Sequence, residues 1–223
     1  MERWVNLVET NCDPEREAEY NQWCEEMVVP QMLATPGFVR ARRYVHKDLR
    51  DGRGKYLALY EIETNDIGTT MSRVVDTQPP SEYFSFPMWR RMLFKHVYET
   101  SAPANRKEGA GKWLNMVEQN CDPARVPEYH DWYNGMHIPD ILITPGFVSA
   151  RRYRIPAFQD GRGEYLALYE IESDDIAETM KTRLANRDKE VAAGRASINR
   201  PGLTRPVWRD VLWKQLSDRR NAS

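Results

Sequence analysis

The sequence has few of the residues that build metal centres and disulfide frameworks. Its 223 residues include only three cysteines and four histidines, and no two cysteines have a CxxC spacing. An odd number of cysteines without that spacing argues against a disulfide scaffold and against a structural zinc site. The histidines form no HxxxH or HxxE pattern with a third suitable ligand. We therefore expect reduced cysteines, no metal and no required cofactor.

The sequence also lacks an excess of charge of either sign and any long apolar run. Lys and Arg number 32 and Asp and Glu 33, so the net charge is -1 and offers no general attraction for a nucleic-acid backbone or an anionic membrane. No apolar run reaches the length of a membrane span, and the opening MERWVNLVE is not an apolar signal segment. We expect a cytoplasmic protein that binds small ligands or proteins, with no nucleic-acid or membrane partner.

What the sequence does contain is an internal repeat with a constant offset of 109 positions. Residues 3–71 align with residues 112–180, and about 40 of the 69 pairs are identical. The most informative stretch is Glu128–Phe147, whose counterpart is Glu19–Phe38. We predict a duplicated domain, with a first repeat at 1–100, a small and polar linker at 101–111, and a second repeat at 112–223.

Each copy shows the same order of predicted elements. An alternating strand comes first, and Asp-Pro then provides an N-cap and a first-turn proline for a helix. Pro139, like Pro30, is expected to kink or end that helix early. A hairpin follows, with Asp-Gly-Arg-Gly turns at 51–54 and 160–163, then a second helix and a last strand. These turns lack the glycine pattern of a phosphate-binding loop.

The order β-α-β-β-α-β predicts an α+β, ferredoxin-like unit in each half. Such a unit carries its helices on one face of an antiparallel sheet, so the other face needs a partner. Two fused copies are expected to pack their sheets together as a self-contained pseudo-dimer, which leaves open a further homo-oligomer. After the second helix the copies diverge, and residues 77–87 and a longer segment in the second copy are either candidate lids or ordinary surface loops.

The spacing of residues on the second repeat's helix resembles a known family. The pattern Tyr129-x-x-Trp-Tyr-x-x-x-His137-x-Pro139, followed by Pro-Gly-Phe, Ala-Arg-Arg-Tyr and Tyr-Leu-Ala-Leu-Tyr-Glu, resembles the dimeric α+β barrel superfamily, particularly its EthD-like branch. That superfamily includes polyketide cyclases, muconolactone-type isomerases, cofactor-free monooxygenases and haem enzymes, so the resemblance implies a fold rather than one reaction. In the EthD-like pattern the helix carries a histidine, which His137 matches and Val28 does not.

His137 is therefore the first candidate for a catalytic residue. A neutral imidazole accepts and returns a proton near pH 7, as enolisation, dehydration or cleavage beside a carbonyl requires. Because Pro139 is expected to break the helix here, nearby carbonyls would favour the imidazolium, and we expect His137 to hold a proton at neutral pH. The alternative is a histidine satisfied within an aromatic core.

Tyr133 is the second predicted catalytic residue, because Cys24 replaces it in the copy that lacks the histidine. On the next strand, Arg151 and Tyr153 share one face and Arg152 occupies the other; one arginine would neutralise Glu170 and the other could bind a carboxylate or enolate. His130 is expected to point away from the helix face that bears Tyr129. Structural packing remains an alternative for each further candidate; the predicted substrate-binding residues are Tyr129, Trp132, Asn115, Arg151, Tyr153 and His96.

Three functions remain open from the sequence. The first is a cofactor-independent acid/base enzyme of the lyase, cyclase or isomerase type, acting on a small hydrophobic carbonyl or phenolic compound with His137 as base. The second is a noncatalytic or stress-associated barrel that binds a hydrophobic or aromatic ligand. The third is a cofactor-free monooxygenase, for which the tryptophan and tyrosine content gives weak support.

Overall fold

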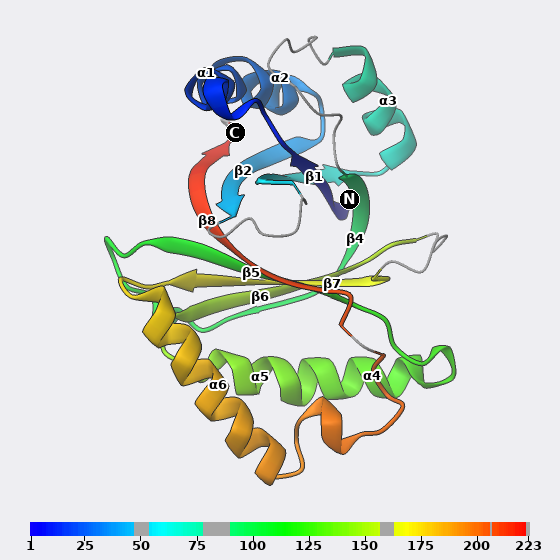
Figure 1. Ribbon diagram of the computed structural model, residues 1–223. Coiled ribbons are helices and arrows are strands. Elements are labelled where there is room, and N and C mark those ends of the chain that lie inside the picture. Colours follow the sequence, from blue (N-terminus) through cyan, green and yellow to red (C-terminus); the bar gives the residue numbers. More distant parts are fainter. Residues whose placement is uncertain (47–53, 78–89, 157–162, 206, 222–223) are drawn as a thin grey trace. The chain divides into compact units, whose positions relative to one another are not determined.

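The computed structural model describes residues 1–46, 54–77, 90–156, 163–205 and 207–221. The chain has an α+β fold, in which eight strands pair in the closed order β1-β3-β2-β8-β5-β7-β6-β4 (Figure 1). It divides into two compact units, residues 1–96 with 213–223 and residues 97–212. No helix among the described residues is long and apolar enough to cross a membrane.

The first unit carries three α-helices and the strands β1, β2 and β3. β3 is the central strand of these three and pairs antiparallel with both neighbours. A π-helical turn joins the first two helices into one continuous rod. The elements are β1 (Glu2–Thr10), α1 (Glu17–Trp23), the π turn (Cys24–Val28), α2 (Val29–Ala34), β2 (Phe38–His46), β3 (Tyr56–Thr64) and α3 (Ile67–Thr77).

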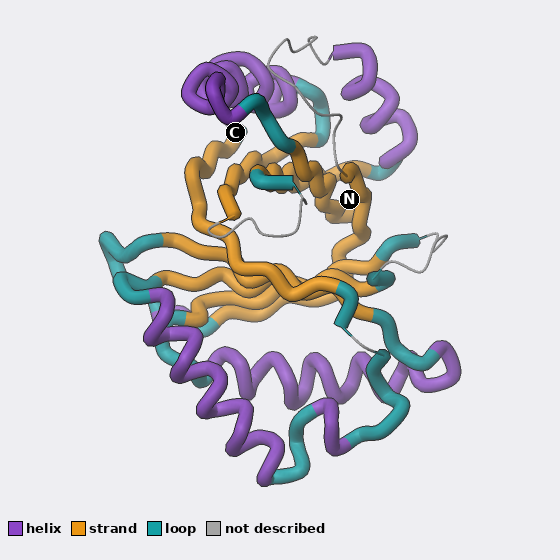
Figure 2. Tube along the Cα trace, viewed as in Figure 1, coloured by secondary structure: helices purple, strands orange, loops and turns teal. Residues whose placement is uncertain are grey.

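The second unit repeats this order with a longer last helix. Its strand β7 pairs antiparallel with β5 and β6, and in Figure 2 the helices lie along one side of these strands. The elements are β5 (Lys112–Gln119), α4 (Val126–Trp132), the π turn (Tyr133–His137), α5 (Ile138–Leu142), β6 (Phe147–Arg154), β7 (Tyr165–Glu172) and α6 (Ile176–Ala192).

The last strand of each half belongs to both units. β4 (Arg90–Ser101) pairs with β1 through its first residues, and its end falls in the second unit. β8 (Arg209–Arg220) begins in the second unit and then pairs with β2 of the first. The end of β8 falls in the first compact unit, where it pairs with β2, and the repeat boundaries at 1–100, 101–111 and 112–223 stay a prediction.

The predicted helix starts are confirmed. The Asp122 carboxylate accepts the Ala124 amide at 3.0 Å, and Pro123 occupies the first turn of the 3-10 helix that precedes α4. The Asp175 carboxylate accepts the Glu178 amide at 3.0 Å at the start of α6. These side chains satisfy amide groups that have no partner inside a first helical turn.

Pro139 does not end the helix, which was one of the two outcomes expected of it. The helix continues through the π turn Tyr133–His137, in which the amide of Ile138 donates to the carbonyl of Tyr133. The wider turn restarts the helix at Ile138, so Pro139 falls in the first turn of α5, where a missing N–H is tolerated. The chain leaves the helix only at Thr144–Gly146, where Gly146 adopts a φ of 94°.

Alternation along the strands of the second unit separates a helix-facing side from the opposite side. The helix-facing residues of β7 are Tyr165, Ala167, Tyr169 and Ile171, and they pack with Tyr129 and other helix residues in one buried cluster. The intervening residues of β7, which are Leu166, Leu168 and Glu170, lie on the opposite side, as the twofold period of a strand requires.

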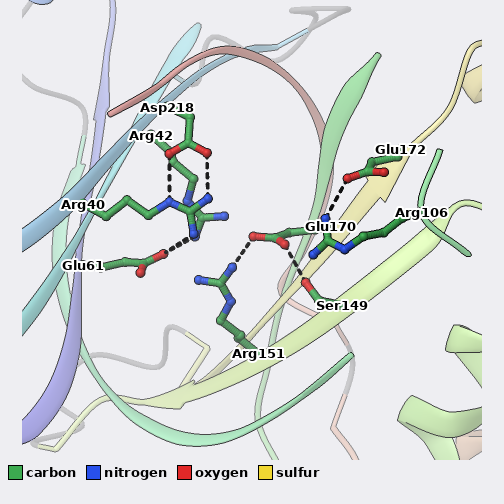
Figure 3. Close-up of polar contacts among 9 residues, drawn as sticks. All are labelled: Arg40, Arg42, Glu61, Arg106, Ser149, Arg151, Glu170, Glu172 and Asp218. Carbon is green, nitrogen blue, oxygen red and sulfur yellow. Dashed lines mark hydrogen bonds and ion pairs between the residues drawn. The ribbon is translucent and has the colours of Figure 1, made fainter. Parts of the chain in front are cut away.

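Ion pairs repeat on the side of the sheets that faces away from the helices. Arg151 donates to Glu170, which also accepts a hydrogen bond from the Ser149 hydroxyl at 2.7 Å (Figure 3). The corresponding pair in the first unit is Arg42 with Glu61, at 2.6 Å. Arg151 is thus the arginine that neutralises Glu170, which leaves Arg152 for the helix-facing side.

Several predicted features lie wholly or mainly outside the described residues. These are the two Asp-Gly-Arg-Gly turns, except Gly54 and Gly163, and the candidate lid at 77–87, except Thr77. The longer segment of the second copy is described: it forms the end of α6 and a stretch that contains a 3-10 helix at Ser197–Asn199.

Two glycines of the second unit give a matched test of how closely the backbone at Gly163 approaches β5. A Cβ at Gly163 would lie 2.7 Å from the Glu118 Cβ and 2.9 Å from the Gln119 amide, whereas a Cβ at Gly135 would meet nothing within 4 Å. Gly163→Ala should lower the free energy of unfolding by about 1–3 kcal/mol. Gly135→Ala should raise it by about 0.5–1 kcal/mol, because alanine restricts the unfolded chain. Urea unfolding of both variants and the wild type measures this; equal stability of both variants would refute the close approach.

Candidate functional site

His137 lies at the end of the π turn, within a group of aromatic rings. Its imidazole stacks on the Trp132 indole with ring centroids 4.8 Å apart, and the Tyr133 ring meets it edge-on at 4.8 Å. No side-chain hydrogen bond to either ring nitrogen is formed by the described residues, and the side chain keeps partial exposure. His137 is therefore held by ring contacts, and its nitrogens are available to a ligand.

The structure contradicts the expectation that His137 is protonated at neutral pH. Desolvation, which is the larger cause, and charge repulsion by Arg183, Arg152 and Arg187 together lower the pKa of its imidazole to about 3. The predicted helix break, which would have favoured the imidazolium, is absent because the π turn carries the helix past Pro139. At pH 7 His137 is a neutral hydrogen-bond and proton acceptor.

Tyr133 is fully buried beside His137 and is paired with a second tyrosine. The Tyr169 hydroxyl donates to the Tyr133 hydroxyl at 3.0 Å, so the Tyr133 proton remains available for a ligand oxygen. Burial raises the pKa of Tyr133 well above its usual value of 10, and repulsion between the two phenolates, were both ionised, would add to this shift. Tyr133 is therefore a neutral O–H donor rather than a phenolate. Sequence reasoning missed Tyr169, whose equivalent in the first copy is Tyr60.

Tyr129 and Trp132 use their polar atoms inside the protein. Gln119 donates to the Tyr129 hydroxyl at 2.7 Å, and the Trp132 indole N–H donates to the Arg195 carbonyl at 2.9 Å. Both rings are at least nine-tenths buried. These two side chains therefore form part of the wall of the candidate site. This agrees with the alternative, raised from the sequence, that they serve structural packing.

Arg152 is the residue that joins the strand to this helix. It is 1% exposed, and its guanidinium carbon lies 4.0 Å from the Tyr133 ring centroid and 5.0 Å from that of Tyr129. Its Nη1 donates to the Asn134 side-chain oxygen at 2.6 Å and lies 3.2 Å from Nδ1 of His130. Its buried Nη2 has no hydrogen-bond partner among the residues that the structure describes. Stacking over both rings favours a desolvated cation here.

His130 belongs to this group, contrary to the expectation that it points away. Its ring packs edge-on against Tyr165 at 5.3 Å, and Nδ1 faces Arg152. Burial lowers its pKa first, with Arg152 and Arg154 adding to the effect, so the neutral form that accepts from Arg152 is favoured.

The remaining predicted residues do not gather around His137. Asn115 lies on the helix-facing side and donates to the Asp210 carboxylate at 2.6 Å. Arg151 lies on the opposite side of the sheet with Glu170, and the alternation of β6 places Tyr153 there as well. His96 belongs to the first unit, where Nδ1 contacts Arg3 at 3.2 Å.

The segment that follows α6 lies against the helix bearing His137. Besides the bond from Trp132 to the Arg195 carbonyl, Arg200 reaches the Met136 sulfur at 3.5 Å, and Leu203 is buried in the same cluster. Cys121 forms an isolated β-bridge with Thr204. The longer segment predicted as a candidate lid is thus part of the wall around the candidate site.

The group combines a proton acceptor, a proton donor and a fixed positive charge. The neutral imidazole of His137 can accept a proton, the Tyr133 hydroxyl can donate a hydrogen bond, and the Arg152 guanidinium carries a positive charge of the kind that stabilises a negative oxygen. No group of three or more metal-ligating side chains occurs in the described part of the chain. The chemistry that these residues support is removal of a proton from a ligand and stabilisation of the resulting anion.

The lowered pKa of His137 predicts how stability depends on pH. The unfolded chain protonates this histidine near pH 6.5 and the folded chain only near pH 3, so stability is complete above 6.5 and falls as pH drops through this window. His137→Gln should reduce the loss between pH 7 and pH 5 by roughly 1–2 kcal/mol relative to the wild type. His130, whose pKa is also lowered, is unchanged in both proteins. Identical pH profiles of urea-unfolding free energy would contradict the shift.

No protein-family model and no curated protein matches this sequence. Solved structures match it over nearly its whole length. A protein from Fusobacterium nucleatum, provisionally named a monooxygenase, superposes with a TM-score of 0.67 at 10% identity and covers 98% of this chain and 94% of its own. An anthrone oxidase-like protein gives 0.59 at 14% identity, with coverages of 100% and 94%.

Chlorite dismutase from Candidatus Nitrospira defluvii gives a TM-score of 0.61 at 10% identity, covering 96% of this chain and 91% of its own. At such low identities the likeness establishes the fold and not the reaction. These neighbours belong to the dimeric α+β barrel superfamily, and this chain shares their fold.

Proposed function

We propose that this protein is an enzyme that removes a proton from a small, largely apolar carbonyl or phenolic compound, with His137 as the proton acceptor. The observation that supports this most directly is a neutral, partly exposed imidazole whose nitrogens have no side-chain hydrogen-bond partner among the described residues. Nearby aromatic rings form an apolar wall suited to such a ligand.

The arginines near His137 both oppose and assist this step. They disfavour an imidazolium in the absence of ligand, which keeps the acceptor unprotonated. When a ligand proton moves to His137, the new enolate or phenolate pairs with the imidazolium and raises its pKa. Arg152 attracts the same anion, and Tyr133 donates a hydrogen bond to its oxygen. The charge arrangement thus favours proton transfer only when the product is an anion.

This step is common to lyase, cyclase and isomerase reactions, and we propose cofactor-independent chemistry of this class, with its broader role in catabolic or secondary metabolism. A cofactor-free monooxygenase is the second candidate, because two structural neighbours are named as a monooxygenase and an anthrone oxidase-like protein. There, a deprotonated anthrone CH2 group would react with O2 to give a ketone and water. A noncatalytic binding barrel remains the alternative if no proton is exchanged.

We further propose that the chain is a tandem-duplicated protein of the EthD-like branch, made of two fused ferredoxin-like repeats and located in the cytoplasm. The repeat offset of 109 and the repeated element order support the duplication. The first copy carries Val28 at the position of His137, so the proposal places one catalytic centre in each chain, in the second repeat.

Proton removal can be tested without the natural substrate. In D2O the wild type should accelerate deuterium uptake at the α-carbon of 2-acetylcyclohexanone, followed by NMR. His137→Gln should reduce the enzyme-dependent rate by about 10²-fold or more, the usual contribution of a general base. Val28→Gln, at the equivalent position of the first copy, serves as the matched control and should retain the wild-type rate.

Oxygen uptake with anthrone distinguishes the second candidate. Stoichiometric O2 consumption that depends on His137 would assign the monooxygenase, whereas exchange without O2 uptake would assign the lyase, cyclase or isomerase class. Equal exchange by wild type and His137→Gln would contradict the role of His137. A stoichiometric haem absorption band in the protein as isolated would contradict cofactor independence.

A further inference from the structure

The second unit contains a buried guanidinium without a carboxylate partner. Arg152 is 1% exposed, and the side chains of the described residues that contact its guanidinium are all neutral: Asn134, His130, Tyr129 and Tyr133. Within the described part of the chain, its buried Nη2 makes no hydrogen bond and Arg152 forms no ion pair. Buried arginines are normally paired with a carboxylate, since an uncompensated buried charge is costly.

The equivalent arginine of the first unit has such a partner. Arg43, 109 positions before Arg152, donates from Nη1 to the Glu25 carboxylate at 2.8 Å and lies over the Tyr20 ring. The same Glu25 oxygen accepts the Ser217 hydroxyl at 2.6 Å. Nη2 of Arg43 donates to the Asn21 side chain at 2.8 Å. Both guanidinium groups hold the same place between strand and helix, but only Arg43 is neutralised.

Two substitutions account for this difference. Asn134 replaces Glu25, so that an amide oxygen contacts Nη1 where the first unit has a carboxylate. His130 replaces Asn21 and contacts Nη1 rather than Nη2, which leaves Nη2 without a partner. Asn134 also has an NH2 group, which can donate to an incoming anion as Glu25 cannot.

We infer that Arg152 and Asn134 bind the carboxylate group of a small-molecule ligand, which accepts from Nη2 of Arg152 and supplies the negative charge that Glu25 supplies to Arg43 in the first unit. The guanidinium fork matches a planar carboxylate, and Glu25 shows that this arginine position accepts one. Asn134 is partly exposed, so the anion approaches from the helix side, as the Glu25 side chain does.

The surroundings favour an aromatic carboxylate. The guanidinium lies 4.0 Å above the Tyr133 ring, and the ring of His137 adjoins the same tyrosine. A planar ligand whose carboxylate meets Arg152 can extend along these rings toward His137. This step rests on the proposed function. If His137 removes a proton from the ligand, the substrate is a carboxylate-bearing compound that Arg152 anchors.

Binding of benzoate, with benzamide as its neutral counterpart, tests the inference in the full chain. Isothermal titration should show saturable benzoate binding at one site per chain, with benzamide at least about tenfold weaker. Asn134→Glu places the Glu25 side chain in the second unit and should weaken benzoate at least about tenfold by occupying Arg152 internally. Glu25→Gln, made in the first unit, should retain wild-type affinity.

The binding position is also measured on the wild-type protein by NMR, so that the test does not depend on whether Asn134→Glu folds. The Nε–Hε NMR signal of Arg152 should shift with benzoate and not with benzamide. Equal affinity for the two ligands, no saturable benzoate binding below about 10 mM, or unchanged affinity in folded Asn134→Glu would overturn the inference. His137→Gln should still bind benzoate, so loss of proton exchange with retained binding would separate failure of the base from failure of the anion site.

Discussion

The contact on which the second unit most depends is the insertion of the Arg152 guanidinium between strand and helix. It lies over the rings of Tyr133 and Tyr129 and bonds to Asn134, so one strand residue fixes three positions of the helix that carries His137. The cost of desolvating this charge is offset by ring contacts and hydrogen bonds rather than by a counter-ion. A positive charge is thereby held in an apolar environment, where its electrostatic effect is strongest.

That charge sets the protonation states of its neighbours. It helps to keep His137 and His130 neutral, although burial is the larger cause for both. Tyr133 also remains neutral, because burial outweighs the attraction of its phenolate to Arg152. The resting site therefore has an acceptor, a donor and one uncompensated cation, which together suit a ligand that is an anion or becomes one.

Much of the fold was predictable because it rests on local signals. Strand alternation, the Asp-Pro helix starts and the repeat gave the element order correctly, and the strand period placed Arg151 and Arg152 on opposite faces. Pro139 misled the prediction because a π turn just before it accommodates the proline without ending the helix. Each last strand contributes residues to both units, and this also depends on backbone pairing, which sequence periodicity does not encode.

The site was predicted in part. His137 and Tyr133 adjoin each other as their spacing suggested, but the protonation of His137 was wrong because it depends on burial and on distant arginines of α6. Arg151 and Tyr153 fall on the other face of the sheet. Tyr169 and the role of His130 were missed. The substitution of Glu25 in the first copy by Asn134 in the second was visible in the sequence, and it is this exchange that changes the partner of Arg43 and Arg152.

The central claim is that His137 is a neutral acceptor that becomes charged only beside a bound anion. The most direct measurement is the 15N chemical shift of its ring nitrogens, followed between pH 4 and pH 8 with and without 4-nitrophenol. The account predicts a neutral ring throughout this range without ligand, and a shift toward the imidazolium when the phenol binds and transfers its proton. An imidazolium at pH 6 in the ligand-free protein would contradict it.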